Sequence, residues 1–166
     1  MFLHGSWDHI LGNMLFLAVF GKNVEDAYGH VRYLLFYFAG GFAATLTQTF
    51  FTLMFGNGAD ARVPNLGASG AVAAVLGAYF ILYHTSTVFG LVVVVPVRIS
   101  AMFFLGFWFL YQLFEANFGL LESGAHGGGT AFFAHVGGFV FGVLVTVLLR
   151  GRLAPSASGV PLQQPI

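Results

Sequence analysis

The stretch LGASGAVAAVLGAY, residues 66–79, holds a serine between small residues inside a long segment without charge. Ser69 is preceded by Gly67 and Ala68 and followed by Gly70. Small residues in membrane helices usually let neighbouring helices approach closely, and a serine among them usually bonds to the backbone. The same hydroxyl, placed beside a base, is a nucleophile. The rest of the sequence has to decide between a packing role and a catalytic one.

The composition predicts a protein that crosses a lipid bilayer several times. Of the 166 residues, 58% are hydrophobic and only 7% are charged. A soluble domain carries about 25% charged residues, so this chain has too few polar side chains to cover a soluble surface. The net charge is zero, which gives no indication of a nucleic-acid partner, and the absence of cysteine removes thiol chemistry. We expect neither a cofactor nor a metal ion.

Five uncharged or nearly uncharged runs are candidates for transmembrane helices. A transmembrane helix needs about 20 residues. The five runs are Ile10–Gly21, Tyr33–Phe55, Gly67–Val97, Ile99–Phe114 and Ser123–Leu149. The first is short and spans only if its helix begins near Leu3 and ends near Lys22. The third is too long for one helix; we expect a helix to about His84 and then a non-helical connection, because Pro96 and the valine run disfavour a helix. The predicted fold class is an all-α membrane protein, a bundle with five transmembrane helices.

The distribution of basic residues indicates how this bundle is oriented in the membrane. Five of them fall on one side of the predicted membrane, whereas Arg62 lies alone on the other; the five are Lys22, Arg32, Arg98, Arg150 and Arg152. The positive-inside rule makes the five-residue side cytoplasmic. We therefore expect an outer N-terminus, a transmembrane domain over residues 1–152 and a disordered cytoplasmic tail over residues 153–166. The expected location is the plasma membrane of a prokaryote.

Two helices carry matching stripes of small residues. At 100° per residue, Ala131, His135, Gly138 and Gly142 share one face of the last helix, and Gly70, Ala74 and Gly77 share one face of the serine helix. Smooth faces of this kind allow close helix contact. If the two stripes pack together, the side chains of Ser69 and His135 come within reach of each other, and a neutral imidazole can then take the serine proton.

Two further polar residues fall at a similar depth in the outer half of the membrane. His9 and Asn13 are four residues apart and project from one face of the first helix. Both can donate hydrogen bonds and, with the backbone N–H of Ser69, could hold a developing oxyanion. Histidine and asparagine also serve as structural groups in membrane helices. Spacing and depth by themselves therefore leave the structural and the catalytic interpretation open.

Several motifs, taken together in this order, resemble the rhomboid family of intramembrane serine proteases. The segment HGSWDHILGNMLFL resembles the H-x-x-x-N segment of the family's second transmembrane helix, and GKNVEDAYGHVRYLLFYFAGG resembles the turn and helix that follow. The segment GASGAVAAVLGAY matches the G-x-S-G motif of the nucleophile, and AHVGGFVFG matches the A-H-x-x-G-x-x-x-G motif of the last core helix. The similarity covers roughly residues 1–150.

The resemblance implies a role for each of the matched residues. Ser69 is expected to be the nucleophile and His135 its base, without a third acidic member, and His9 and Asn13 are expected to stabilise the oxyanion. The expected packing glycines of the two helices are Gly70, Gly77, Gly138 and Gly142. The expected substrates are single-pass transmembrane proteins, cut near the outer membrane face. The Gly-rich segment ESGAHGGGT, residues 122–130, would act as a cap over the site.

This sequence departs from the family pattern in two places. The family core has six helices, whereas this chain begins at what resembles the second, so we expect the first core helix to be missing and the chain alone to be weakly active. Ala73, one turn after the serine, stands where some members carry an aromatic residue that stacks on the histidine. The imidazole of His135 must then be oriented by another group.

Two other functions compete with proteolysis. The first is a catalytically impaired rhomboid-like protein that binds membrane clients, which the missing helix favours and the presence of both Ser69 and His135 disfavours. The second is a small transporter or metal conduit built on the six histidines. His4 and His9, five residues apart, would face each other poorly on a helix, and the clear spans contain no acidic residue for a relay.

Overall fold

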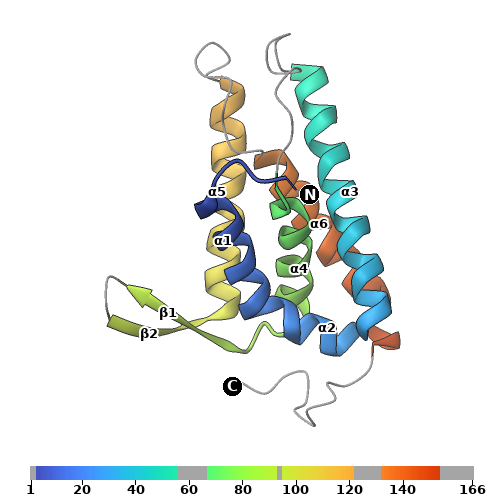
Figure 1. The fold of residues 1–166 in the computed structure, drawn as a ribbon, viewed down its shortest axis with the longest axis vertical. Coiled ribbons are helices and arrows are strands. Elements are labelled where there is room, and N and C mark those ends of the chain that lie inside the picture. Colours follow the sequence, from blue (N-terminus) through green and yellow to red (C-terminus); the bar gives the residue numbers. More distant parts are fainter. Residues whose placement is uncertain (1–2, 56–66, 93–94, 122–131, 154–166) are drawn as a thin grey trace.

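Helices form where the sequence has long apolar runs without proline. The structure, a computed structural model, describes residues 3–55, 67–92, 95–121 and 132–153. In chain order after residue 29, the helices are α3 (His30–Phe55), α4 (Ser69–Leu82), α5 (Ala101–Leu121) and α6 (Phe132–Leu149), which is followed by the short 3₁₀ helix η3 (Arg150–Arg152) (Figure 1). Arg62, the Gly-rich segment 122–130 and residues 154–166 of the predicted tail lie outside the described residues.

The N-terminal helical segment is longer than the sequence predicts and contains an irregular turn. It consists of α1 (Trp7–Phe16), the π-helical η1 (Leu17–Gly21) and α2 (Lys22–Tyr28). It begins late because Ser6 is the N-cap, whose side chain accepts a hydrogen bond from the backbone N–H of His9. It continues beyond Lys22 and ends at Gly29, whose φ of 78° suits glycine. The helix expected between Leu3 and Lys22 is thus shifted toward the C-terminus.

The valine-rich connection between α4 and α5 forms a β-hairpin rather than a helix. β1 (Thr87–Val92) pairs antiparallel with β2 (Val95–Ser100), with Thr87 opposite Ser100. β-branched residues favour extended backbone, and Pro96 is tolerated because each strand of a two-stranded sheet is an edge strand. The hairpin projects sideways from the helices at the end of the molecule where α2 lies (Figure 1).

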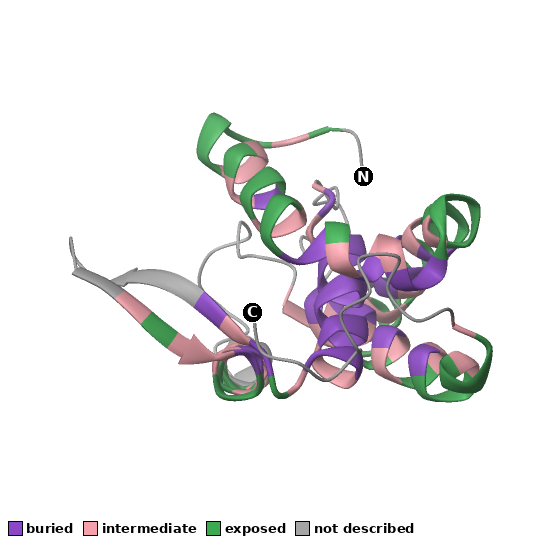
Figure 2. Cartoon of the chain, turned by 90° about the horizontal axis from the view of Figure 1, so that it is seen from below, coloured by how far each residue is buried: buried purple, intermediate pink, exposed green. Residues whose placement is uncertain are grey.

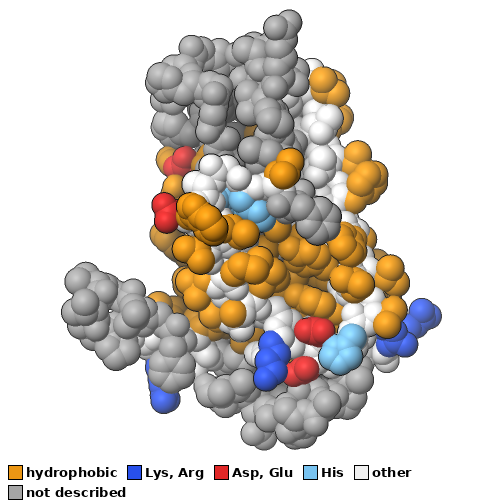
Figure 3. All heavy atoms as spheres, in the orientation of Figure 1, with side chains coloured by type: hydrophobic (Ala, Val, Ile, Leu, Met, Phe, Trp, Pro, Cys, Tyr) orange, Lys and Arg blue, Asp and Glu red, His pale blue; other side chains and the backbone are white. Residues whose placement is uncertain are grey.

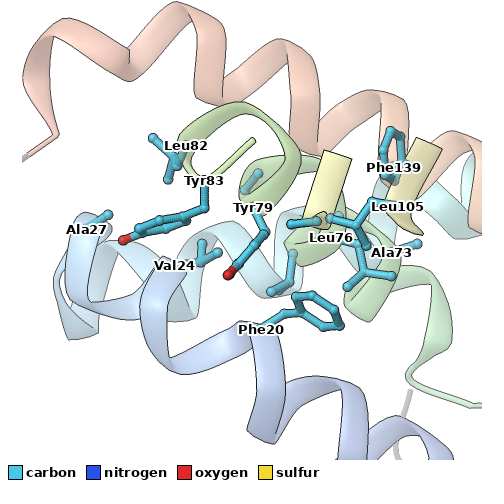
Figure 4. Packing of buried hydrophobic residues seen from close by; sticks show 14 of the residues in the cluster. Phe20, Val24, Ala27, Ala73, Leu76, Tyr79, Leu82, Tyr83, Leu105 and Phe139 are labelled. Atoms are coloured by element: carbon cyan, nitrogen blue, oxygen red, sulfur yellow. The ribbon is translucent and has the colours of Figure 1, made fainter. Parts of the chain in front are cut away.

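Helix α4 is the centre of the fold, buried on all sides by the other helices. Every residue from Gly70 to Tyr79 is buried, and Figure 2 shows this helix in the middle of the molecule with exposed surfaces turned outward around it. At one end of α4, Phe20 of η1 packs edge-on against the ring of Tyr79, with a centroid distance of 4.9 Å (Figure 4). Such complete burial requires small side chains, which the stretch 66–79 supplies.

A buried polar contact joins α2 to α6 at the same end. The hydroxyls of Tyr28 and Thr146 lie 2.7 Å apart, and Thr146 also donates to the carbonyl oxygen of Gly142. Burial raises the pKa of Tyr28 above its ordinary value of 10.0, and the hydrogen bond with Thr146 lowers it by less. The Tyr28 hydroxyl therefore stays protonated, and it donates to Thr146 because the Thr146 proton is used by Gly142.

The outer surface is apolar enough for a membrane. In the described part of the chain, His30–Phe55 and Phe132–Arg152 are long and apolar enough to cross a bilayer, and Ser69–Leu82 and Ala101–Glu115 are shorter apolar helices. Large side chains such as Phe42, Phe107 and Leu148 are exposed. Figure 3 shows a broad hydrophobic belt above the end of the molecule where Lys and Arg side chains gather. The helical architecture agrees with the predicted class, and the number of five spans stays a prediction.

Candidate active site

Ser69 lies at the first turn of α4, at mid-height in the molecule. Helix α4 has 14 residues and α3 has 26, or about 21 Å and about 39 Å at 1.5 Å per residue. The Ser69 end of α4 consequently stops well short of the upper end of α3 (Figure 1). Because the first N–H groups of a helix have no intrahelical partner, the backbone N–H of Ser69 is a free donor of the helix, and the helix dipole adds partial positive charge there.

The imidazole of His135 contacts the Ser69 hydroxyl directly. Nε2 of His135 lies 2.8 Å from Oγ of Ser69, although the two residues are 66 positions apart in the sequence. His135 is in the first turn of α6, and only 8% of its surface is exposed. A hydroxyl held at this distance from an unprotonated ring nitrogen has the geometry that general-base activation requires.

Close contact between α4 and α6 brings the two side chains together. A Cβ atom on Gly138 would collide with the carbonyl oxygen of Gly70, and one on Gly142 would collide with the carbonyl oxygen of Ala74. A Cβ atom on Gly77 would in turn meet the carbonyl oxygen of Phe139. Of the predicted α4 stripe, Gly70 and Ala74 are turned toward Ala44 and Gly40 of α3. Gly77, Gly138 and Gly142 lie in the contact between α4 and α6, where each faces the backbone of the other helix. No residue other than glycine fits these three positions without moving a helix.

Helix α3 fixes the start of α6 through a side chain that the sequence analysis missed. The side-chain oxygen of Gln48 accepts a hydrogen bond of 3.1 Å from the backbone N–H of Ala134, one of the N–H groups in the first turn of α6. Such groups lack partners within their own helix. The Gln48 amide thereby acts as a cap supplied by another helix, next to His135 in the sequence. Only the amide of Gln48, inside a run without charge, could have indicated it.

A second missed residue contacts the other side of the imidazole. Nδ1 of His135 lies 2.8 Å from Oε1 of Gln112 on α5, and Gln112 is 5% exposed. The indole ring of Trp108, one turn earlier on α5, lies 5.9 Å from the imidazole centroid at an interplanar angle of 39°. The available signal was a lone amide in the apolar run FLYQLF, residues 109–114.

His9 and Asn13 lie on α1, and the ring of His9 contacts the loop that leads to Ser69. A Cβ atom on Gly67, whose φ is 104°, would collide with the ring of His9, so only glycine allows this loop to pass. Asn13 is 6% exposed, and its Nδ2 has no hydrogen-bond partner among the described residues. No hydrogen bond in the described part of the chain joins His9 or Asn13 to Ser69.

One expectation about the histidines is wrong. The rings of His4 and His9 are in edge-to-face contact with centroids 5.2 Å apart. The helical spacing argument failed because His4 precedes the N-cap Ser6 and is not helical. Among the described residues, no group of three or more His, Cys, Asp or Glu side chains is arranged to hold a metal ion.

Nearly the whole chain is similar to one known protein family. The sequence model of the rhomboid domain matches residues 1–152 of this chain. The chain belongs to the rhomboid family. Rhomboid proteins are integral to membranes and act on membrane-embedded substrates; most are serine proteases, and some members lack protease activity. The resemblance inferred from the motifs is therefore confirmed at the level of the family.

Individual rhomboid relatives are distant in sequence. Rhomboid-related protein 2 of Mus musculus is 29% identical over 150 residues, which cover 87% of this chain and 44% of that protein. RHOMBOID-like protein 4 of Arabidopsis thaliana is 30% identical over 151 residues, which cover 90% of this chain and 32% of that protein. RHOMBOID-like protein 1 of the same plant is 38% identical over 78 residues, which cover 47% of this chain and 18% of that protein. The chain thus spans less than half the length of these relatives. No solved structure matches it.

Proposed function

We propose that this protein is an intramembrane serine endopeptidase that hydrolyses peptide bonds of single-pass transmembrane substrates near the outer membrane face. The observation that carries the proposal is the distance of 2.8 Å between Oγ of Ser69 and Nε2 of His135. In this proposal Ser69 is the nucleophile and His135 is the base. Membership of a family composed mostly of serine proteases supports the assignment.

The reaction proceeds through an acyl-enzyme. Nε2 of His135 removes the proton of Ser69 while Oγ attacks the carbonyl carbon of the scissile bond, which gives a tetrahedral intermediate with a negative oxygen. The imidazolium then gives this proton to the leaving amine, and the C–N bond breaks. Water, deprotonated by the same nitrogen, attacks the ester, and the returning proton restores the Ser69 hydroxyl and releases the carboxylic acid product.

Three donors are proposed to stabilise the negative oxygen. They are the backbone N–H of Ser69 and the side chains of His9 and Asn13. The buried Nδ2 of Asn13 supports this role, because a buried donor without a described partner is unusual in a folded protein and often indicates function. The glycine at position 67 supports it too, since it lets the loop before Ser69 lie against the His9 ring.

The proposed topology places this chemistry in the outer half of the membrane. Residues 1–152 form the transmembrane domain with five spans, and the end that carries Lys22, Arg98 and Arg150 faces the cytoplasm, as does the C-terminus. The proposed location is the plasma membrane of a prokaryote. The short α4 supports an active site below the outer surface, since its N-terminal end stops near the middle of the longer α3.

A reconstituted cleavage assay tests this function. The purified protein is placed in lipid vesicles with a single-pass substrate, and the products are identified by mass spectrometry. We expect one main cut within a few residues of the outer end of the substrate helix, and no cut in a soluble peptide of unrelated sequence. Substrate that is retained by the protein but never cut would contradict proteolysis and would favour the alternative, a catalytically impaired rhomboid that binds membrane clients.

The oxyanion donors are tested by single substitutions. We expect Asn13→Ala to lower kcat by about 10²–10³-fold, because the loss of one preorganised donor weakens binding of the transition state by about 2.7–4 kcal/mol. His9→Ala should act in the same direction. Reaction rates of both variants and of the double variant are measured in the same vesicles. If all three cleave at the parent rate, the oxyanion is held by other groups.

A further inference from the structure

We infer that Gln112 is a positioning residue for His135: its amide oxygen accepts the Nδ1–H of the imidazole and thereby keeps Nε2 unprotonated and aimed at Ser69. This inference rests on the proposed function, because it adds a third side chain to the proposed pair of nucleophile and base. No hydrogen bond in the described part of the chain joins Gln112 to the reacting hydroxyl, and in this inference Gln112 acts through the histidine alone.

The contact is short and is shielded from solvent. Oε1 of Gln112 and Nδ1 of His135 are 2.8 Å apart, and the two residues are 5% and 8% exposed. Burial of an amide costs free energy unless the amide is hydrogen-bonded. In the apolar interior between α5 and α6, the imidazole supplies that partner. The hydrogen bond consequently restricts both the glutamine rotamer and the rotation of the ring.

The polarity of this hydrogen bond decides which nitrogen can act as a base. A neutral imidazole has one N–H donor and one acceptor nitrogen, and the partner of one nitrogen fixes the state of the other. A carbonyl oxygen only accepts, so Nδ1 must carry the proton and Nε2 must be the acceptor. Nε2 is the nitrogen that lies 2.8 Å from the Ser69 hydroxyl. The opposite tautomer would place a proton on Nε2 and abolish its capacity as a base.

Other neighbours of the ring cannot replace the amide. Ala73, one turn after Ser69 on α4, is fully buried and has no polar side-chain atom. Trp108 lies at an angle of 39° to the imidazole, and the ring of Phe132 is 6.5 Å away in an edge-on orientation. These rings limit the tilt of the imidazole but offer no acceptor for Nδ1. Among the described residues, only Gln112 has a polar atom within hydrogen-bond distance of Nδ1.

The face of α5 that carries Gln112 packs against other helices, which limits the movement of the Gln112 side chain. Leu105, Trp108 and Gln112 are spaced by three and four residues and share one side of the helix. Leu105 is fully buried, and Phe109 beside this face stacks on Phe139 of α6 with centroids 4.6 Å apart. The orientation of the imidazole thus depends on how α5 packs against α6.

The test compares Gln112→Met with Gln112→Glu in the vesicle assay. Methionine has a similar length but no amide oxygen, so we expect kcat to fall by about 100-fold, as for a catalytic group displaced by about 1 Å, while KM changes by less than about threefold. Glutamate keeps an acceptor oxygen at the same position, and we expect it to restore kcat to within about tenfold of the parent. If the methionine variant does not fold, Gln112→Asn, which keeps the amide but is too short to reach Nδ1, carries the same expectation.

Val24→Ala is the control, because Val24 is fully buried on α2 and has no part in the proposed site. It creates a cavity and lowers the melting temperature, but it leaves the hydrogen bond between Gln112 and His135 in place, so we expect its kcat to stay within a few-fold of the parent. A purely structural role for Gln112 predicts instead that kcat follows the melting temperature across all variants. That result, or an unchanged kcat in Gln112→Met, overturns the inference.

The outcome is separable from the proposed function. Ser69→Ala is measured in parallel with the Gln112 variants. If Ser69→Ala is inactive and Gln112→Met cleaves at the parent rate, the inference about Gln112 fails and the proteolytic function stands. If Ser69→Ala still cleaves substrate, the proposed function itself fails.

Discussion

Ser69→Ala is expected to abolish cleavage of a membrane-anchored substrate, with kcat reduced by about 10⁶-fold, as in soluble serine proteases that lose the nucleophile. The physical reason is the absence of any other hydroxyl at hydrogen-bond distance from Nε2 of His135 among the described residues. The free energy of unfolding should change by about 1 kcal/mol or less, because the substitution removes one hydrogen bond and leaves the small-residue packing of α4 intact. Turnover and melting temperature are measured on the same vesicle preparation.

Ser86→Ala is the control for this substitution. Ser86 is also buried, with 1% of its surface exposed, but it follows the opposite end of α4, where its carbonyl oxygen accepts a hydrogen bond from the backbone N–H of Ala101. We expect this variant to retain the turnover of the parent. Cleavage by Ser69→Ala, in a preparation free of host proteases, would show that the nucleophile is another residue.

Gly142→Leu is expected to remove both activity and stability. A Cβ atom at this position already collides with the carbonyl oxygen of Ala74, so a larger side chain must push α6 away from α4. Overpacking typically costs about 1–3 kcal/mol and occasionally more, and here it also separates His135 from Ser69. We expect a large drop in melting temperature together with loss of turnover, and Gly138→Leu should behave alike.

An alanine pair makes the test of helix contact sharper. Gly142→Ala adds only the colliding Cβ atom, whereas Gly106→Ala on α5 adds one whose nearest neighbour is Phe80 at 4.0 Å. We expect the first change to lower the melting temperature and the second to leave it nearly unchanged. Equal stability of the two alanine variants, or a Gly142→Leu variant that stays folded and active, would mean that α4 and α6 do not depend on this close approach.

The contact between α4 and α6 could be predicted from the sequence because it depends on small residues at helical spacing. Glycine at positions 70, 77, 138 and 142 follows helical spacing, and a stripe without side chains has an evident use in packing. The sequence predicted that Ser69 and His135 come within reach of each other if the two helices pack together, and Oγ of Ser69 lies 2.8 Å from Nε2 of His135. The hairpin region was recognised as non-helical for an equally local reason, namely Pro96 and the valine run.

Contacts made by long side chains between distant helices could not be predicted in this way. The partners in the Gln112–His135 and Gln48–Ala134 hydrogen bonds are 23 and 86 positions apart. A glutamine in an apolar helix shows that some partner exists, but its identity depends on the rotation and depth of each helix. The π-helical segment Leu17–Gly21 was also missed, and its Phe20 packs against Tyr79 of the distant helix α4.

The central claim is that the Ser69 hydroxyl, activated by His135, is the nucleophile, and a fluorophosphonate probe tests it most directly. The probe forms a covalent bond with activated serines, and peptide mass spectrometry locates the adduct. We predict a single phosphonylated residue, Ser69, with labelling absent in Ser69→Ala and strongly reduced in His135→Ala. An adduct on a different residue, or labelling of Ser69→Ala equal to that of the parent, would contradict the account.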